Sequence, residues 1–103
     1  MQIGQQGNPF SGTTIEGGGK ISVGTTAVEV TFTTETRSIV ITADAANTGV
    51  LYVGKSNVTS AGANAMTYLA AGDVFTIDYD DSSVPLYVVG SAASQNFWKG
   101  AAI

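Results

Sequence analysis

The chain of 103 residues contains no cysteine and no histidine. Without cysteine, neither a disulfide scaffold nor a thiolate metal site can form. The lack of histidine removes the commonest general base and the commonest metal ligand. Because these two absences leave little catalytic chemistry, we expect a protein that is not an enzyme and holds no cofactor.

Charge is also scarce in this sequence. Charged residues make up 12% of the chain and its net charge is −4, whereas a soluble domain has roughly twice that share of charge. The basic residues are few and far apart, whereas nucleic-acid binding needs clustered positive charge. We therefore expect no nucleic-acid partner, and a largely neutral surface that partner proteins cover.

Long hydrophobic runs are missing as well. No apolar stretch approaches the roughly 18 residues of a membrane-spanning helix, and the first residues lack the basic and apolar regions of a signal peptide. These features predict synthesis in a cytoplasm without a membrane partner. The length suits one domain with one core.

Residues 1–18 form a segment rich in Gln, Gly, Ser and Thr. Such a segment buries too little apolar surface to fold alone. We predict an N-terminal arm over 1–18, followed by a single domain over 19–103. The arm is either a disordered tail or an extended segment that becomes ordered on a neighbouring subunit. In the second case, Phe10 and Ile15 are its anchors.

Beyond the arm, apolar residues recur with a period of two. Val28, Val30 and Phe32 alternate with polar residues, which is typical of a strand with one buried and one wet face. Short strands with turns between them indicate a β-sandwich or barrel. We predict an all-β domain, a β-sandwich or jelly-roll-like fold, with strands at residues 20–23, 27–33, 38–42, 50–53, 67–70, 74–79, 86–89 and 95–101.

One segment matches a nucleotide-binding motif. Residues 49–56 read Gly-Val-Leu-Tyr-Val-Gly-Lys-Ser, which fits the G-x-x-x-x-G-K-[ST] pattern of a phosphate-binding loop. Strong strand formers fill the pattern, although a phosphate cradle needs inward-facing N–H groups and a helix directly after it. We therefore interpret the segment as a strand that forms a hairpin with residues 38–42, and we expect no bound nucleotide.

A group of aspartates lies between residues 73 and 81. The stretch that begins at Asp78 starts like a calcium-binding EF-hand loop, but it lacks the required glycine, and Val89 replaces the final glutamate. One interpretation is a looser calcium site. The other is a polar turn in which carboxylates accept local N–H groups, and we favour it. The members of the group are Asp73, Asp78, Asp80 and Asp81.

The aromatic residues admit two interpretations. Flat rings could form a sugar-binding platform, or they could lie in the core and at protein interfaces, where aromatics are enriched. Because neighbouring strand residues face opposite sides, one ring of Phe97 and Trp98 can fill the core while the other meets a partner. We favour the second interpretation. The candidate interface residues are Phe10, Ile15, Tyr87 and Trp98.

The segment 37–103 resembles small structural proteins of tailed bacteriophages. The similarity lies in RSIVITADAANTGVLYVGKSNVTS, MTYLAAGDVFTIDYDD and PLYVVGSAASQNFWKG. It consists of the strand phrase Val-Leu-Tyr-Val-Gly-Lys-Ser, a Leu-x-x-Gly-Asp turn and a Leu-Tyr-Val-Val strand.

This resemblance implies a virion component, above all a capsid decoration (cement) protein. Such proteins bind the major capsid protein on the capsid surface after synthesis in the host cytoplasm. They commonly have a β-sandwich or jelly-roll-like domain, and they often form trimers. Two alternatives stay open. One is a tail, baseplate or fibre protein that binds a glycan, and the other is a carbohydrate-binding module of a larger enzyme.

Overall fold

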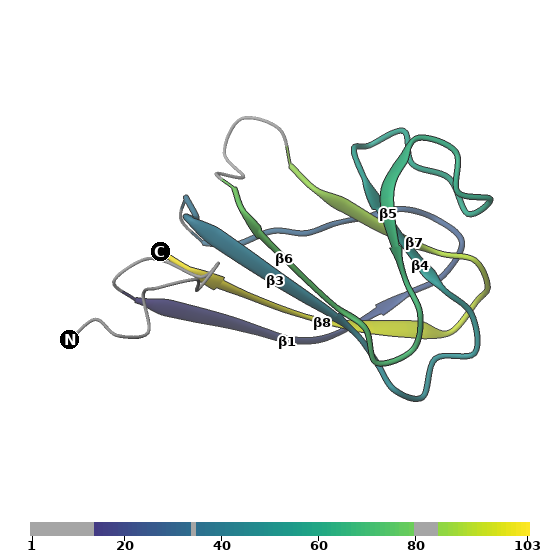
Figure 1. Cartoon of the computed structure of the whole chain (residues 1–103), viewed down its shortest axis with the longest axis horizontal. Coiled ribbons are helices and arrows are strands. Elements are labelled where there is room, and N and C mark those ends of the chain that lie inside the picture. The colour runs from purple at the N-terminus through teal and green to yellow at the C-terminus, as the bar shows by residue number, and fades with distance from the viewer. Residues whose placement is uncertain (1–13, 34, 80–84) are drawn as a thin grey trace.

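The computed structural model describes residues 14–33, 35–79 and 85–103, and within them the chain is all-β (Figure 1). Each predicted strand overlaps an observed one. The described part contains no helix that could cross a membrane. The strands are β1 (Ile15–Val23), β2 (Val28–Glu29), β3 (Ser38–Ala43), β4 (Leu51–Gly54), β5 (Ala65–Leu69), β6 (Val74–Asp78), β7 (Tyr87–Gly90) and β8 (Gln95–Ala102).

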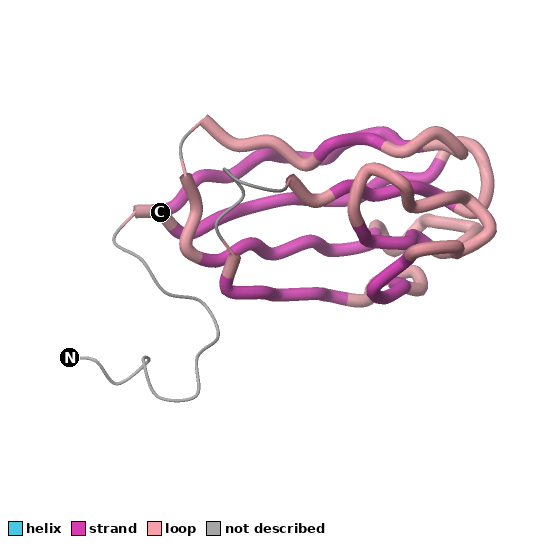
Figure 2. Tube along the Cα trace, turned by 90° about the horizontal axis from the view of Figure 1, so that it is seen from above, coloured by secondary structure: helices cyan, strands magenta, loops and turns pink. Residues whose placement is uncertain are grey.

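The strands form two four-stranded antiparallel sheets. One has the order β1-β8-β3-β6 and the other β2-β7-β4-β5. The strand pairs β1·β8, β2·β7, β3·β6 and β4·β5 are nested, as if one long hairpin had been wrapped into two layers, which is the arrangement of a jelly roll. The strands follow the long axis of the domain (Figure 2). The predicted sandwich or jelly-roll-like fold is confirmed.

The core lies between the two sheets. On β3, Ile39 and Ile41 are fully buried, whereas Val40 and Thr42 face outward and stay partly exposed. Leu51 and Val53 of β4 close the core from the other sheet. The period of two in the sequence therefore reflects one face in the core and one face away from it.

The predicted hairpin between residues 38–42 and 50–53 is wrong. β3 pairs with β6 and β8, whereas β4 pairs with β5 and β7, so the connection between them passes from one sheet to the other. A turn signal such as Asn47-Thr48-Gly49 bends the chain locally but does not select the partner strand. The crossing is held by Gln95, whose buried Oε1 accepts the N–H groups of Thr48 and Gly49 at 2.9 and 2.8 Å.

The N-terminal boundary of the domain also differs from the expectation. β1 begins at Ile15, which lies opposite Ala102, and the backbone of Thr14 is hydrogen-bonded to Ile103. The end of the predicted arm is therefore part of the sheet. Three successive glycines, with a register shift between Gly17 and Gly19, hide the strand pattern in the sequence. Residues 1–13, which include Phe10, lie outside the described residues.

Candidate functional site

The segment that matches the phosphate-binding pattern is a strand and its flanking turns, as predicted. The N–H of Gly49 donates to Gln95 Oε1 and that of Val50 donates to Ser91 Oγ at 3.0 Å. β4 follows, and then a loop from Lys55 to Asn64 instead of a helix. Because the N–H groups at the start of the pattern already have acceptors and no helix follows it, the segment has no phosphate cradle.

The glycine that precedes Lys55 is needed for packing. A Cβ atom on Gly54 would lie 2.8 Å from the carbonyl oxygen of Asn64, because the loop after β4 folds back over it. In the same loop, Val58 is buried, and Gly62 packs close to the ring of Tyr52. The loop thus covers the outer side of β4, which explains why this strand lacks an alternating pattern.

The aspartate group is divided by the fold. Asp73 directly precedes β6, whereas Asp78 is its last residue. Asp73 Oδ2 accepts the N–H of Ala70 at 3.0 Å, and Asp78 Oδ1 accepts the hydroxyl of Ser38 at 2.7 Å. Asp80 and Asp81 lie outside the described residues. Within the described ranges, no group of three or more potential metal ligands occurs, and Asp73 makes the local turn bond expected of it.

The two adjacent aromatics of β8 have opposite environments. Phe97 is fully buried in the core, whereas Trp98 on the other face of the sheet is 45% exposed. The prediction that the two rings lie on opposite faces of the strand, with one of them in the core, is confirmed; that the other ring meets a partner stays a prediction. Trp98 therefore marks the candidate site.

Trp98 belongs to a row of side chains across all four strands of its sheet. The strand registers place it opposite Lys20 of β1 and Thr42 of β3, and they place Thr42 opposite Val74 of β6. Val74 is an exposed hydrophobic residue, at 60%. We call this row, together with Asp44 directly after β3, the Trp98 face. It is an outer sheet surface with one cation, one carboxylate and two exposed apolar side chains.

The indole ring of Trp98 is held in place from two sides. Its Nε1 donates to Asp44 Oδ1 at 3.0 Å, and the other oxygen of Asp44 accepts the N–H of Ala46 at 3.2 Å. Lys20 Nζ lies 5.7 Å from the ring centroid, a cation–π distance. The hydrogen bond from Trp98, then that from Ala46 and then the charge of Lys20 lower the pKa of Asp44 from its usual value.

This arrangement predicts an acid transition that the single tryptophan reports. A carboxylate with a lowered pKa in the folded state adds stability above its unfolded value, and that contribution is lost as the pH falls through the folded pKa. Trp98 fluorescence should therefore change in a transition whose midpoint lies below the usual pKa of an aspartate. In Asp44→Asn the transition should be absent, with far-UV circular dichroism showing that both proteins stay folded. A transition unchanged in Asp44→Asn would contradict this assignment.

The structure brings only some of the predicted interface residues together. Ile15, 82% exposed, lies on β1 opposite Ala102 and shares the outer sheet face with Trp98, since Ala102 and Trp98 are four residues apart on β8. Tyr87 lies on the other sheet, half-buried and opposite Glu29. Ile15 and Trp98 can thus meet one partner together, whereas Tyr87 faces away from it.

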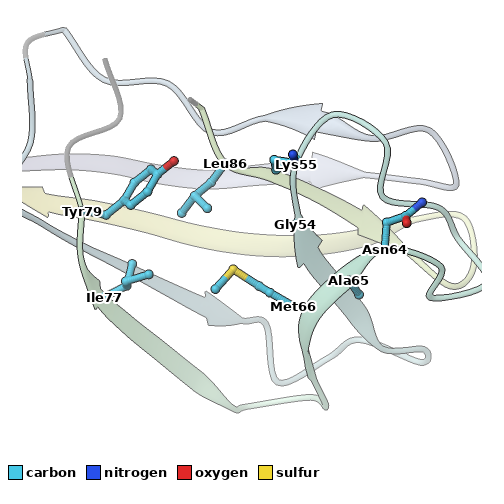
Figure 3. A pocket seen from close by; sticks show the side chains of 8 residues that line it. All are labelled: Gly54, Lys55, Asn64, Ala65, Met66, Ile77, Tyr79 and Leu86. Atoms are coloured by element: carbon cyan, nitrogen blue, oxygen red, sulfur yellow. The ribbon is translucent and has the colours of Figure 1, made fainter. Parts of the chain in front are cut away.

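A second feature, which the sequence did not indicate, is an apolar cleft between β5 and β6. Its volume is about 430 Å³, and Met66, Ile77, Tyr79 and Leu86 point toward one another around it (Figure 3). It was missed because its walls come from both sheets. The remaining lining residues are Gly54, Lys55, Asn64 and Ala65.

No protein-family model, curated protein or solved structure matches the chain. The function must therefore be argued from the fold, the Trp98 face and the composition.

Proposed function

We propose that this chain is a non-enzymatic structural protein of a bacteriophage virion, a decoration protein that binds the major capsid protein on the capsid surface. The Trp98 face carries the proposal. It presents an exposed tryptophan and, two strands away in the same row, the exposed Val74 on the outer surface of one sheet, and protein interfaces are enriched in aromatics.

The orientation of Trp98 supports a binding role. Because Asp44 accepts its Nε1–H, the ring keeps one orientation in the free protein and loses little freedom on binding. The same hydrogen bond satisfies the indole N–H, so a partner can cover the ring without leaving a buried donor unpaired. These are properties of a residue that can anchor an interface.

The nature of the partner rests on three further arguments. Jelly rolls are frequent in viral capsid proteins and also in lectins, although a fold does not by itself define a function. The resemblance of residues 37–103 to phage structural proteins favours the capsid. A low share of charged residues fits a protein whose surface is largely covered after assembly.

The test is binding to capsids that were produced without this protein. Trp98→Ala should lower the affinity by roughly 30-fold or more, as expected for an interface tryptophan, while the melting temperature stays close to that of the wild type. Tyr68→Ala is the control, because Tyr68 is an aromatic residue that is even more exposed than Trp98, at 64% against 45%, but lies on the other sheet. Full binding by Trp98→Ala, or an equal loss with Tyr68→Ala, would contradict the proposal.

A second candidate function rests on the same ring. An exposed indole with a carboxylate and an ammonium group beside it also suits stacking against a neutral sugar, as in a tail or fibre protein that binds a host glycan. Comparing the binding of the protein to glycans with its binding to capsids distinguishes the two functions. Binding of the isolated protein to a glycan array, lost in Trp98→Ala and without affinity for capsids, would favour the glycan.

A further inference from the structure

The two sheets have four edge strands, and three of them carry features that discourage pairing with another chain. β1 has a register shift at its glycines and carries Lys20, β2 has two residues, and β5 has a register shift against β4. β6 has none of these features. It pairs in regular register with β3 over its whole length, and its sequence Val-Phe-Thr-Ile-Asp contains no Lys, Pro or Gly.

The backbone groups at the open edge of β6 can be assigned from its pairing with β3. The N–H of Ala43 donates to Asp73 O and that of Tyr79 donates to Arg37 O, each at 2.9 Å. Because hydrogen-bonded pairs alternate along antiparallel strands, Phe75 and Ile77 also point their backbone groups at β3. The residues between them, Val74, Thr76 and Asp78, point theirs away from β3. No residue of the described ranges pairs with that side of β6.

We propose that two copies of this chain pair β6 with β6 in antiparallel orientation about a two-fold axis at Thr76. In that register Thr76 faces the partner's Thr76, and Val74 faces the partner's Asp78. Each of the three outward-pointing residues then belongs to a hydrogen-bonded pair. The result is one continuous sheet of eight strands, β1-β8-β3-β6 followed by the same strands in reverse order.

The side chains fit the same register. On the inner face, Phe75 meets the partner's Ile77. In a single copy, Phe75 and Ile77 are only partly buried. On the outer face, the two Thr76 side chains form a favourable cross-strand pair. No like charges face each other directly, because Asp78 lies opposite Val74. The pairing also covers the exposed Val74 and the edge of the cleft that Ile77 lines.

The identity of the partner follows from the other edges. The phage resemblance implies a trimer. A closed ring of three copies that is formed by pairing of edge strands needs two different complementary edges in each copy. The remaining edges are bulged, short or carry a lysine, so β6 has only another β6 as a matching edge. A two-fold axis between antiparallel strands runs perpendicular to the sheet, and therefore both Trp98 faces point to the same side. This inference does not depend on the proposed capsid function.

Analytical ultracentrifugation over a wide concentration range tests the pairing. The wild type should change from monomer to dimer as its concentration rises. Thr76→Lys should stay monomeric, because two ammonium groups would face each other across the axis. Ser22→Lys, which adds the same charge on the same sheet face at the β1 edge, should still form dimers. Circular dichroism checks that both variants are folded.

Amide hydrogen exchange gives a second measurement at single-residue level. In concentrated wild type, exchange at Val74, Thr76 and Asp78 should slow relative to dilute protein, while it stays the same at Phe75 and Ile77, which already bond to β3. A protein that remains monomeric at all concentrations would overturn the proposal. So would a trimer, or a dimer that survives Thr76→Lys.

Discussion

Replacing Gln95 with leucine is expected to destabilise the domain by about 2–4 kcal/mol, because leucine would remove all the hydrogen bonds that the buried side-chain amide makes. Gln95 Oε1 accepts from Thr48 and Gly49, and its Nε2 donates to Thr48 Oγ1 at 3.1 Å and to Ala93 O at 2.7 Å. The side chain is fully buried. Leucine has a similar volume but can make none of these bonds. For a domain of this size, the melting temperature should fall by roughly 10–25 °C.

Urea unfolding followed by circular dichroism measures this loss. Ser22→Leu is the control, because it also replaces a polar side chain with leucine but at an exposed position on β1. It should change the free energy of unfolding by no more than about 0.5 kcal/mol. If Gln95→Leu unfolded at the same urea concentration as the control, the crossing between the sheets would be held by other contacts.

The positions of the strands could be predicted from the sequence because they depend on local alternation. Val28 and Val30, or Ile39 and Ile41, reveal a buried face within a few residues of chain. The pairing of the strands could not be predicted in the same way. The turn at Asn47-Thr48-Gly49 suggested a hairpin, whereas its partner is Gln95, far away in the sequence.

The same limit applies to the candidate site. The exposure of Trp98 followed from its position next to Phe97, but its contacts with Lys20 and Asp44 depend on the order of strands in the sheet. The strand register supplies this information, because it places Lys20 opposite Trp98. The motif at residues 49–56 shows the converse case. Its sequence matches a nucleotide site, but its N–H groups at Gly49 and Val50 donate to Gln95 and Ser91.

β8 connects the stability of the domain with the proposed binding surface. It is a central strand that pairs with both β1 and β3. Its first residue, Gln95, holds the crossing between the sheets, Phe97 fills the core, and Trp98 faces outward. Because these residues lie within one rigid strand, the orientation of the indole depends on the packing beneath it. Loss of core packing should therefore also weaken the binding surface.

The adjacent pair Phe97 and Trp98 allows this division of roles to be measured. Phe97→Ala should destabilise the domain by about 3–5 kcal/mol, because it removes a fully buried ring and leaves a cavity between the sheets. That loss is a large part of the 5–15 kcal/mol that typically stabilises a domain. Phe97→Leu, which keeps most of the volume, should cost about 1–2 kcal/mol.

Trp98→Ala, one residue further along, should change the free energy of unfolding far less, by about 1 kcal/mol or less, because its ring is exposed and its main contacts lie at the surface. Urea unfolding of the three variants, with capsid binding measured on those that remain folded, separates the two roles. Phe97→Leu should keep its affinity while Trp98→Ala loses it. Equal destabilisation by Phe97→Ala and Trp98→Ala would show that the tryptophan belongs to the structural core and would remove the main argument for a binding surface on this sheet.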